Sequence, residues 1–279
     1  MTWTFTRDLA AYLTAAGPSV AARPVSNTIL LTTADALERR GPHAFGQADP
    51  FFGWWTRSDG TVTGGLLCTP PFPVLVGALP PEAVRALAAA LCNEPLFSGI
   101  SGFNARRADA DVLAGSWGRP ARVAEENRLY RLSGLIPPDP APAGRVREAA
   151  EEDLPLLLEW IAEFNREAGQ PGAASPAALR DRISYGGLLL WEDGEAPVSL
   201  ASFTRPIGSA SRIGPVWTPP GARRRGYAAG VTHAASRAAQ AAGASEVLLF
   251  TDLANATSNG VYLRLGYVPV EDRAEVVAA

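Results

Sequence analysis

An arginine-rich turn is the first place in this sequence where residue types and spacing could do chemistry. Arg223 to Arg225 stand directly before Gly226, between SRIGPVW (211–217), which reads as a strand, and GYAAGVTHAASRAAQAAGA (226–244), which reads as a helix. A turn of this kind leaves the first N–H groups of the helix unpaired, and the helix dipole adds partial positive charge there. Glycine admits a ligand close to the backbone, and guanidinium groups add charge-assisted bonds. The pattern predicts an anion site, for which phosphate is the usual occupant.

A second polar patch lies downstream, in LLFTDLANATSNGVYLRLGYVPV (248–270). A helix is expected over roughly 256 to 265. At 100° per residue, its face from Asn255 through Ser258 and Asn259 to Tyr262 spans an arc of about 100°. Polar groups that end in a phenol, on the helix next to the anion turn, suit the wall of a ligand site.

The elements that must position these patches follow from hydrophobic periodicity. Apolar residues at helical spacing after Asp153 predict a helix, and the Asp-Gly pair in LLLWEDGEAPVSLASF (188–203) predicts a hairpin. EVLLFT (246–251) predicts a strand after the alanine-rich helix, so this strand–helix–strand unit should be a right-handed parallel crossover. YVPV (267–270) should close the segment as a strand.

The first half of the chain repeats this order more faintly. A hairpin around Asp59-Gly60, a strand at 72–79, a helix from Pro80-Pro81 and a last strand at 127–132 are expected. We therefore predict an α/β fold with two similar domains, each a central mixed β-sheet flanked by helices. The first half reads LPPEAVRAL (79–87) where the second has its arginine turn, and is not expected to bind the same ligand.

The stretch SGLIPPDPAPAG (133–144) holds four prolines in twelve residues, which cannot continue a helix or a central strand. We expect domains at 1–132 and 145–279, joined by an exposed linker at 133–144.

Composition excludes several classes of function. The net charge is −3, so broad nucleic-acid binding is not expected and any anion site should be local. All 25 basic residues are arginine, which excludes Schiff-base chemistry and a Walker A lysine. The two cysteines and two histidines have no metal-ligand spacing, so no metal is expected. No apolar run approaches the roughly 20 residues of a membrane span. No signal peptide is evident at the start, and we expect a cytoplasmic protein.

Two stretches resemble a known family. RRRGYA (223–228) fits Arg/Gln-x-x-Gly-x-Gly/Ala, and VWTPPGARRRGYA (216–228) resembles the pyrophosphate-binding turn of the GNAT acyltransferase superfamily. The stretch 248–270 is similar to the second cofactor motif of that family, with an asparagine, a helical tyrosine and a Gly-Tyr ending. The resemblance covers about 145–279. It implies a tandem GNAT protein with a degenerate N-terminal half and acetyl-CoA (coenzyme A) as co-substrate.

The resemblance also implies roles for individual residues. Backbone groups of the strand before the turn would hold the pantetheine arm, the turn would bind the pyrophosphate, and the start of the following helix would contact the cofactor. Tyr262 would be the general acid that protonates the departing thiolate. The cofactor-binding residues are Val216, Trp217, Thr218, Arg223, Arg224, Arg225, Gly226, Tyr227, Ala228, Ala229, Asn255, Ser258 and Asn259.

A general base is missing from this set. Family members often carry a carboxylate on the strand before the turn, and 211–217 has none. Asp252 is the nearest carboxylate by sequence. It can equally cap the following turn, and a base that acts through water is an equal alternative.

The leading prediction is an acetyl-CoA-dependent N-acetyltransferase, in which an amine attacks the thioester directly. The acceptor would be a small-molecule or peptide amine, and the protein would be a monomer or a homodimer that acts on no nucleic acid and no membrane. One alternative is an acyl-CoA-binding sensor with little turnover, suggested by the missing base. The other is an aminoacyl transferase of the paired GNAT-like type, against which the acidic pI and the intact cofactor turn argue.

Overall fold

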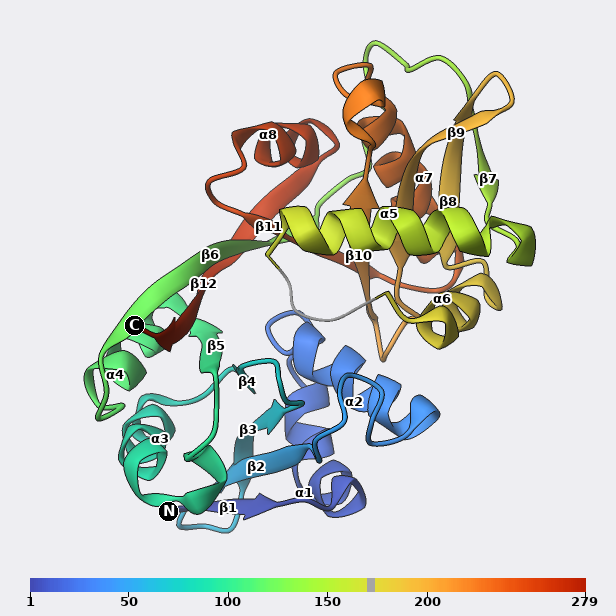
Figure 1. The fold of residues 1–279 in the computed structure, drawn as a ribbon. Helices are drawn as coiled ribbons and strands as arrows, with labels where there is room; N and C mark the ends of the chain where they lie inside the picture. The colour runs from blue at the N-terminus through green and yellow to red at the C-terminus, as the bar shows by residue number, and fades with distance from the viewer. Residues whose placement is uncertain (170–173) are drawn as a thin grey trace. The chain divides into compact units, whose positions relative to one another are not determined.

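A computed structural model describes residues 1–169 and 174–279 of the chain (Figure 1). The chain divides into two compact units: unit 1 is Met1–Arg128 with Glu271–Ala279, and unit 2 is Leu129–Val270. Strands β6 (Ala121–Leu132) and β12 (Tyr267–Ala278) each begin in one unit and end in the other.

Unit 1 is a mixed sheet with helices on both faces. Strands β1 to β4 form an antiparallel series, β4 pairs with β5 in parallel, and β12 pairs with β5 in antiparallel orientation. Phe51 packs with α3 and α4, whereas the next residue, Phe52, packs with α1 and α2 on the other face. Its further elements are β1 (Thr2–Thr6), α1 (Leu9–Ala21), α2 (Thr28–Arg40), β2 (Phe51–Thr56), β3 (Val62–Cys68), β4 (Val74–Val76), α3 (Pro81–Asn93), β5 (Gly102–Arg106) and α4 (Arg107–Gly115).

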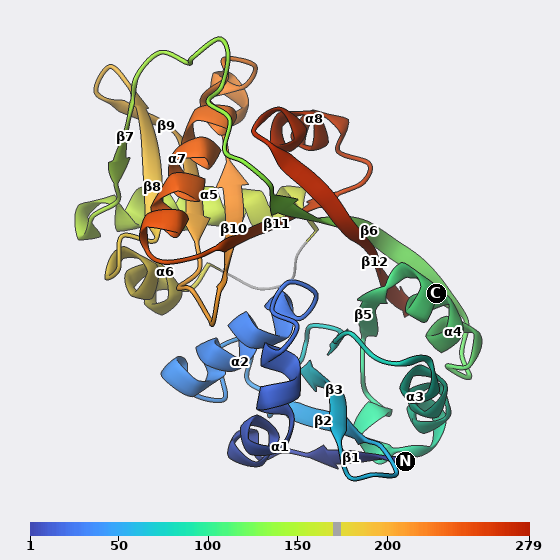
Figure 2. The ribbon, with the colours of Figure 1, turned by 180° about the vertical axis from the view of Figure 1, so that it is seen from behind.

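Unit 2 has the same arrangement. Strands β7 to β10 are antiparallel neighbours, and β10 pairs with β11 in parallel. Helices α5 and α6 cover one face of this sheet and α7 the other, as Figures 1 and 2 show from opposite sides. Its elements are β7 (Arg145–Glu148), α5 (Leu154–Glu167), α6 (Pro176–Ile183), β8 (Leu188–Asp193), β9 (Ala196–Phe203), β10 (Ala210–Trp217), α7 (Tyr227–Ala241), β11 (Glu246–Asp252) and α8 (Ala256–Arg264).

The predicted fold class is confirmed: each unit is a mixed sheet flanked by helices, and the elements expected around the arginine turn are all present. The sequence analysis missed four elements, namely β1, α1, α2 and the edge strand β7. The alternation RVRE (145–148) is too short and too charged to stand out as a strand. It pairs with β8 along one edge of the sheet of unit 2.

The units also differ in extent from the expected ranges of 1–132 and 145–279. The last strand continues past Val270, and residues 273–277 pair with β5 of unit 1. Ala274 and Val276 are buried in the core of unit 1. The chain therefore returns at its C-terminus to the unit in which it began.

The segment 133–144, expected as an exposed linker, consists mostly of exposed residues, and it is also hydrogen-bonded to unit 2. The N–H groups of Ser133 and Ile136 donate to the carbonyls of Gly266 and Leu265, at 3.0 Å each. At the other end, the indole N–H of Trp191 donates to the carbonyl of Ala143 at 2.8 Å. The segment is therefore part of the body of unit 2.

Candidate active site

Strands β10 and β11 are paired only over their first halves. The parallel register runs from Ala210–Glu246 to Ile213–Leu249. On its other edge, β10 stays paired with β9 as far as Trp217, after a shift of register that follows Ile213. Gly214 lies at this shift with φ +142°, a conformation that L side chains rarely adopt. Beyond Ile213, the edge of β10 that faces β11 is open to an extended ligand.

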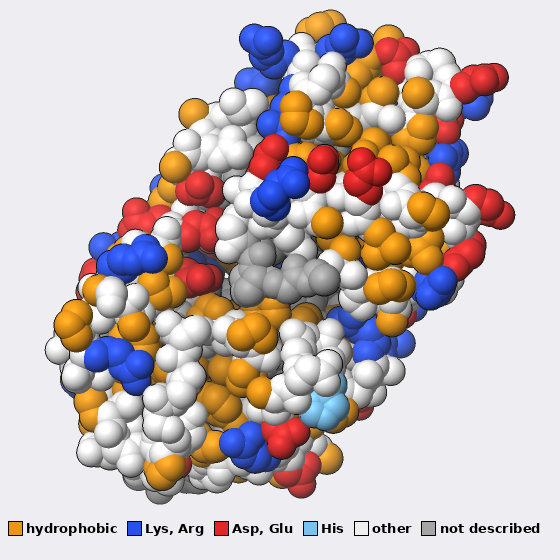
Figure 3. Space-filling model, viewed as in Figure 1, with side chains coloured by type: hydrophobic (Ala, Val, Ile, Leu, Met, Phe, Trp, Pro, Cys, Tyr) orange, Lys and Arg blue, Asp and Glu red, His pale blue; other side chains and the backbone are white. Residues whose placement is uncertain are grey.

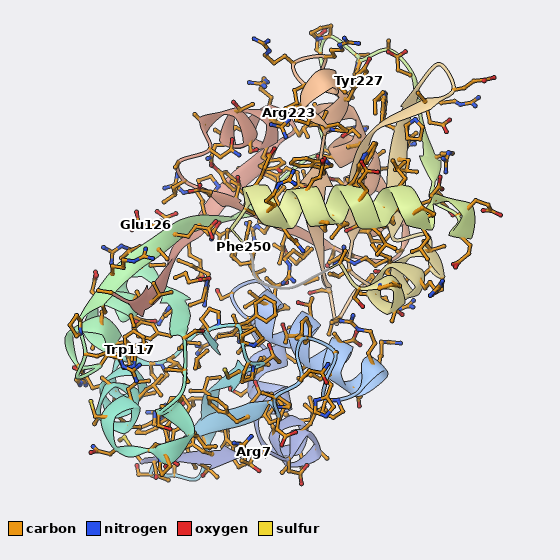
Figure 4. All side chains as sticks on the ribbon, in the orientation of Figure 1. Arg7, Trp117, Glu126, Arg223, Tyr227 and Phe250 are labelled. Atoms are coloured by element: carbon orange, nitrogen blue, oxygen red, sulfur yellow. The ribbon has the colours of Figure 1, made fainter. Side chains whose placement is uncertain are left out.

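The turn after β10 ends in an uncapped helix N-terminus. Gly226, with φ +83°, precedes α7, no side chain caps the helix, and its first turn has no acidic residue. The first helical hydrogen bond runs from the N–H of Gly230 to the carbonyl of Gly226. The N–H groups at the start of α7 therefore have no helical partner and can bind an anion. Figure 4 shows Arg223 and Tyr227 at this end of unit 2.

A pocket of about 650 Å³ opens at this helix end. It is bounded by the proline-rich segment 136–143, by the turn and first residues of α7, and by the last turn of α8. The side chains that line it include three arginines and one carboxylate, that of Asp139. The lining residues from the turn and the helices are Arg224, Arg225, Gly226, Ala229, Val261, Arg264 and Leu265. The charge balance of the pocket favours an anion.

The three consecutive arginines have different surroundings. Arg223 forms a bidentate ion pair with Glu167 of α5, at 2.9 and 3.0 Å, and donates to the carbonyl of Thr218. Its guanidinium also lies 4.7 Å from the ring centroid of Trp217. Acidic and basic side chains lie next to one another over α5 in Figure 3. Arg223 thus ties the turn to the rest of unit 2, while Arg224 and Arg225 line the pocket.

Tyr227 is an anchor for the start of α7. Its ring is buried, and its hydroxyl is hydrogen-bonded to the carboxylate of Asp193 at the end of β8. One turn later, Gly230 leaves room for Pro142 and Trp191, since a Cβ atom there would lie 2.8 to 3.0 Å from their rings. Segment 136–143 is therefore packed directly on the helix that the anion would contact. Pro142, Asp193 and Arg264 were not among the residues expected at the site.

The two asparagines of α8 have structural partners. Asn255 is the N-cap, and its side-chain oxygen accepts from the N–H of Ser258 at 3.0 Å. The side-chain amide of Asn259 donates to the carbonyls of Asp252 and Asn255, and its oxygen accepts from the hydroxyl of Tyr130 at 2.8 Å. Both amides hold the β11–α8 turn in shape.

Tyr262 is buried on α8, with 8% of its surface exposed, among the aromatic rings of Tyr130 and Tyr267. Burial raises the pKa of its phenol to about 12, and a hydrogen bond with the Ser258 side chain offsets part of that rise. The phenol is therefore protonated throughout the neutral range. It can donate a proton but cannot serve as a base.

A comparison with protein families decides what this arrangement is. Residues 154–267 match the model of the Acetyltransferase (GNAT) family. This range, 154–267, is a GNAT acetyltransferase domain. The matched range begins at α5 and ends where β12 begins, so it contains the open strand edge, the arginine turn and α8. The match indicates acyl transfer.

Solved structures show that the whole chain shares the fold of tandem GNAT proteins. A GNAT-family acetyltransferase from Colwellia psychrerythraea matches over 100% of both chains, with TM-score 0.65 and 13% identity. A GCN5-related N-acetyltransferase from Sphaerobacter thermophilus covers 99% of this chain and 95% of its own, with TM-score 0.63 and 14% identity. A tandem GNAT protein from the clavulanic acid biosynthesis pathway covers 100% and 98%, with TM-score 0.59 and 14% identity. No curated protein sequence matches the chain.

The carboxylate of Asp252 is hydrogen-bonded within its own turn. Its Oδ1 accepts from the N–H of Ala254 at 2.8 Å, and its carbonyl accepts from the amide of Asn259. Asp252 thus closes the turn that leads into α8, which is one of the alternatives expected for it.

In the GNAT-like fold of unit 1, the parallel strands β4 and β5 correspond to β10 and β11 of unit 2. The two units differ because an arginine side chain binds at this position in unit 1. Arg273 of β12, only 1% exposed, donates to the carbonyls of Val76 at 2.7 Å and Asn104 at 3.1 Å. Its Nε donates to the side chain of Asn104, and its Nη1 pairs with Glu271. A guanidinium therefore takes one backbone acceptor from β4 and one from β5. Sequence reasoning found no role for Arg273, because only the fold brings β12 next to β5.

Over 1–169 and 174–279, no three or more His, Cys, Asp or Glu side chains are grouped as a metal site requires. Within the same ranges, none of the helices is both long enough and apolar enough to cross a bilayer.

Proposed function

We propose that this GNAT protein is an acetyl-CoA-dependent N-acetyltransferase that transfers the acetyl group directly to an amine. The observation that carries the proposal is the uncapped start of α7, which opens onto an arginine-lined pocket beside the open edge of β10. Coenzyme A has the matching parts: a pyrophosphate for the helix end and an extended amide-bearing arm for a strand edge.

The binding roles follow from this placement. The backbone of Val216, Trp217 and Thr218 pairs with the pantetheine arm. The first N–H groups of α7 bind the pyrophosphate, with Arg224 and Arg225 at the rim, while Arg223 holds the turn in place. The cofactor wall is supported by Asn255 and Asn259, because their side-chain amides fix the turn from which α8 and its tyrosine project. Ser258 supplies the backbone N–H that Asn255 caps.

The chemistry requires one proton to reach sulfur. The neutral amine attacks the thioester carbonyl, a C–N bond forms and the C–S bond breaks. A backbone N–H of β10 stabilises the oxyanion, the ammonium proton is lost to water, and Tyr262 donates its proton to the departing thiolate. The phenolate left on Tyr262 takes a proton back from water, so that each transfer yields one amide and one thiol. Because burial raises the pKa of this phenol to about 12, the acid stays protonated in the alkaline range in which amines lose their proton.

The direct test is acetyl-CoA with a panel of small-molecule and peptide amines, followed by thiol release and by mass of the product. N-acetylated product with one free thiol per transfer supports the proposal. Tight coenzyme A binding without transfer to any amine would favour the sensor instead.

We predict that the three arginines of the turn contribute unequally to coenzyme A binding. Replacing Arg224 and Arg225 together by Gln should weaken coenzyme A binding by roughly tenfold or more, because charge-assisted bonds to the pyrophosphate are lost. It should also flatten the dependence of the dissociation constant on salt. Arg223→Gln is the matched comparison and should cost less than about fivefold, since it breaks an exposed ion pair with Glu167. Calorimetry at two salt concentrations measures both, and a larger loss in Arg223→Gln would reverse the assignment.

We expect one coenzyme A per chain. In unit 1, Arg273 occupies the strand gap, and α3 begins with Pro81 and Glu82, whose charge opposes an anion. Calorimetry should therefore return a stoichiometry near one. A second site of similar affinity would contradict the degenerate status of this half.

A further inference from the structure

A second group of arginines lies on the other face of the GNAT domain. Arg182 comes from α6, Arg205 from the β9–β10 connection and Arg212 from β10. Arg182 donates to Ser202 and to the carbonyl of Gly214, the latter at 2.8 Å. Gly214 is the residue at which the edge of β10 becomes open. The group therefore lies at the point where β10 and β11 cease to pair, which is where the thioester would react.

This group is separate from the arginine turn. Ser202 lies two residues after Leu200, which packs under α5 and α6, so both side chains are on the α5/α6 face. The intervening Ala201 packs against α7 on the opposite face. An anion bound at the start of α7 therefore has the sheet between itself and these guanidinium groups, and a different molecule must be the partner of the second group.

Arg212 has no counter-charge. Over the described residues it forms no ion pair, and its buried Nη1 has no hydrogen-bond partner. Burial, to which the positive charge of Arg182 adds, lowers its pKa to about 10, so it remains a cation at neutral pH. Arg212 as a whole is only partly buried, but a guanidinium nitrogen that is buried without a hydrogen-bond partner costs stability, and an anion bound there would supply the missing acceptor.

Arg205 is only partly neutralised. Its Nη2 donates to Asp181 at 2.8 Å, while its buried Nε has no partner. The guanidinium lies 3.9 Å from the ring centroid of Tyr185, and the side chain is 28% exposed. The group thus has donor atoms to spare and is open to solvent at one side.

We propose that the acceptor amine carries an anionic group, a carboxylate in the simplest case, which Arg212 binds together with Arg182 and Arg205. The proposal rests on the proposed function and adds the substrate class to it. A guanidinium group at the point where β10 and β11 cease to pair would hold the anion while the amine of the same molecule points at the thioester carbonyl.

The experiment compares matched amines: amino acids with their carboxamides, and phosphoethanolamine with ethanolamine. At pH 8 the carboxamides are the less basic amines and more of them are neutral, so intrinsic reactivity favours them. We expect kcat/KM to be at least tenfold higher for the acids. Arg212→Gln should remove this preference by raising KM for the acids, with coenzyme A affinity unchanged, whereas Arg237→Gln on the exposed side of α7 should keep it.

Three results would overturn the inference. The first is that carboxamides react as well as acids. The second is that Arg212→Gln slows both members of a pair equally. In either case the proposed N-acetyltransferase activity stands. The third concerns stability: Arg212→Met should leave the melting temperature unchanged or raise it, whereas Arg147→Met, which breaks ion pairs with Asp153 and Glu192, should lower it. A clear fall in Arg212→Met shows a structural arginine, even if no amine is acetylated. Preference for phosphoethanolamine alone supports the anion site and names phosphate as its ligand.

Discussion

Tyr262→Phe is expected to lower the turnover number by about 10²–10⁴, the range for loss of a general acid, while the affinity for coenzyme A hardly changes. The substitution keeps the ring and its packing against Tyr130 and Tyr267 and removes only the hydroxyl. Among the described residues, that hydroxyl is hydrogen-bonded to the Ser258 side chain, so the cost in stability of losing it should be about 1 kcal/mol or less. Steady-state kinetics on the best acceptor, with calorimetry for coenzyme A, separates the two effects.

The matched control is Tyr267→Phe. Its hydroxyl is hydrogen-bonded to Ser236 at 2.6 Å inside the same aromatic cluster. Losing that bond should lower the melting temperature and leave the turnover of the folded protein unchanged. If Tyr262→Phe behaves in the same way, the phenol of Tyr262 is a packing residue and another group must protonate sulfur.

The pH profile gives an independent check on Tyr262. Burial raises its pKa to about 12, so its acidic form persists above the ordinary tyrosine value of about 10. Turnover should therefore rise as the amine deprotonates and should show no fall from loss of the acid between pH 8 and 10. An alkaline limb in this range that disappears in Tyr262→Phe would contradict the raised pKa.

Gly226→Val is expected to weaken coenzyme A binding by about 100-fold, the second large effect. At φ +83° a β-branched residue is strained by more than the ordinary cost of about 1–3 kcal/mol. Its Cβ would also lie 3.3 Å from Pro142. The turn must change its backbone angles to relieve this, and the N–H groups that should meet the pyrophosphate then point elsewhere. Calorimetry measures the loss.

Gly243→Val, just after the other end of α7, is the control. Gly243 has φ +100° and no atom within 4 Å of a built Cβ, so the backbone strain is similar and the turn is untouched. It should lower the melting temperature and leave the dissociation constant of coenzyme A as it was. Equal losses of affinity in the two variants would show that the effect of Gly226→Val is general destabilisation, and the anion site would lose its support.

Local patterns account for what could be predicted at the candidate site. The strand, the glycine turn and the alanine-rich helix that follow one another over 211–244 are encoded by residues next to each other, and the structure has all three. Asn255 caps α8 through a short-range hydrogen bond, but the sequence analysis assigned this residue only as a cofactor contact. The different surroundings of Arg223 and its two neighbours could not be predicted, because Glu167 and Trp217, which hold it, come from an earlier helix and from the core.

The sequence by itself determined the repeated order of elements, the uncapped helix end with its arginines, and the absence of lysine chemistry, since each depends on residue type and on neighbours within a few positions. Only the tertiary structure decided which guanidinium groups are paired. Arg273 fills the strand gap of unit 1 because β12 returns to pair with β5. Among the described residues, the buried Nη1 of Arg212 has no hydrogen-bond partner, and the fold brings it close to another cation, Arg182. The free energy of a charge depends on burial and on partners distant in sequence, and these exist only once the chain has folded.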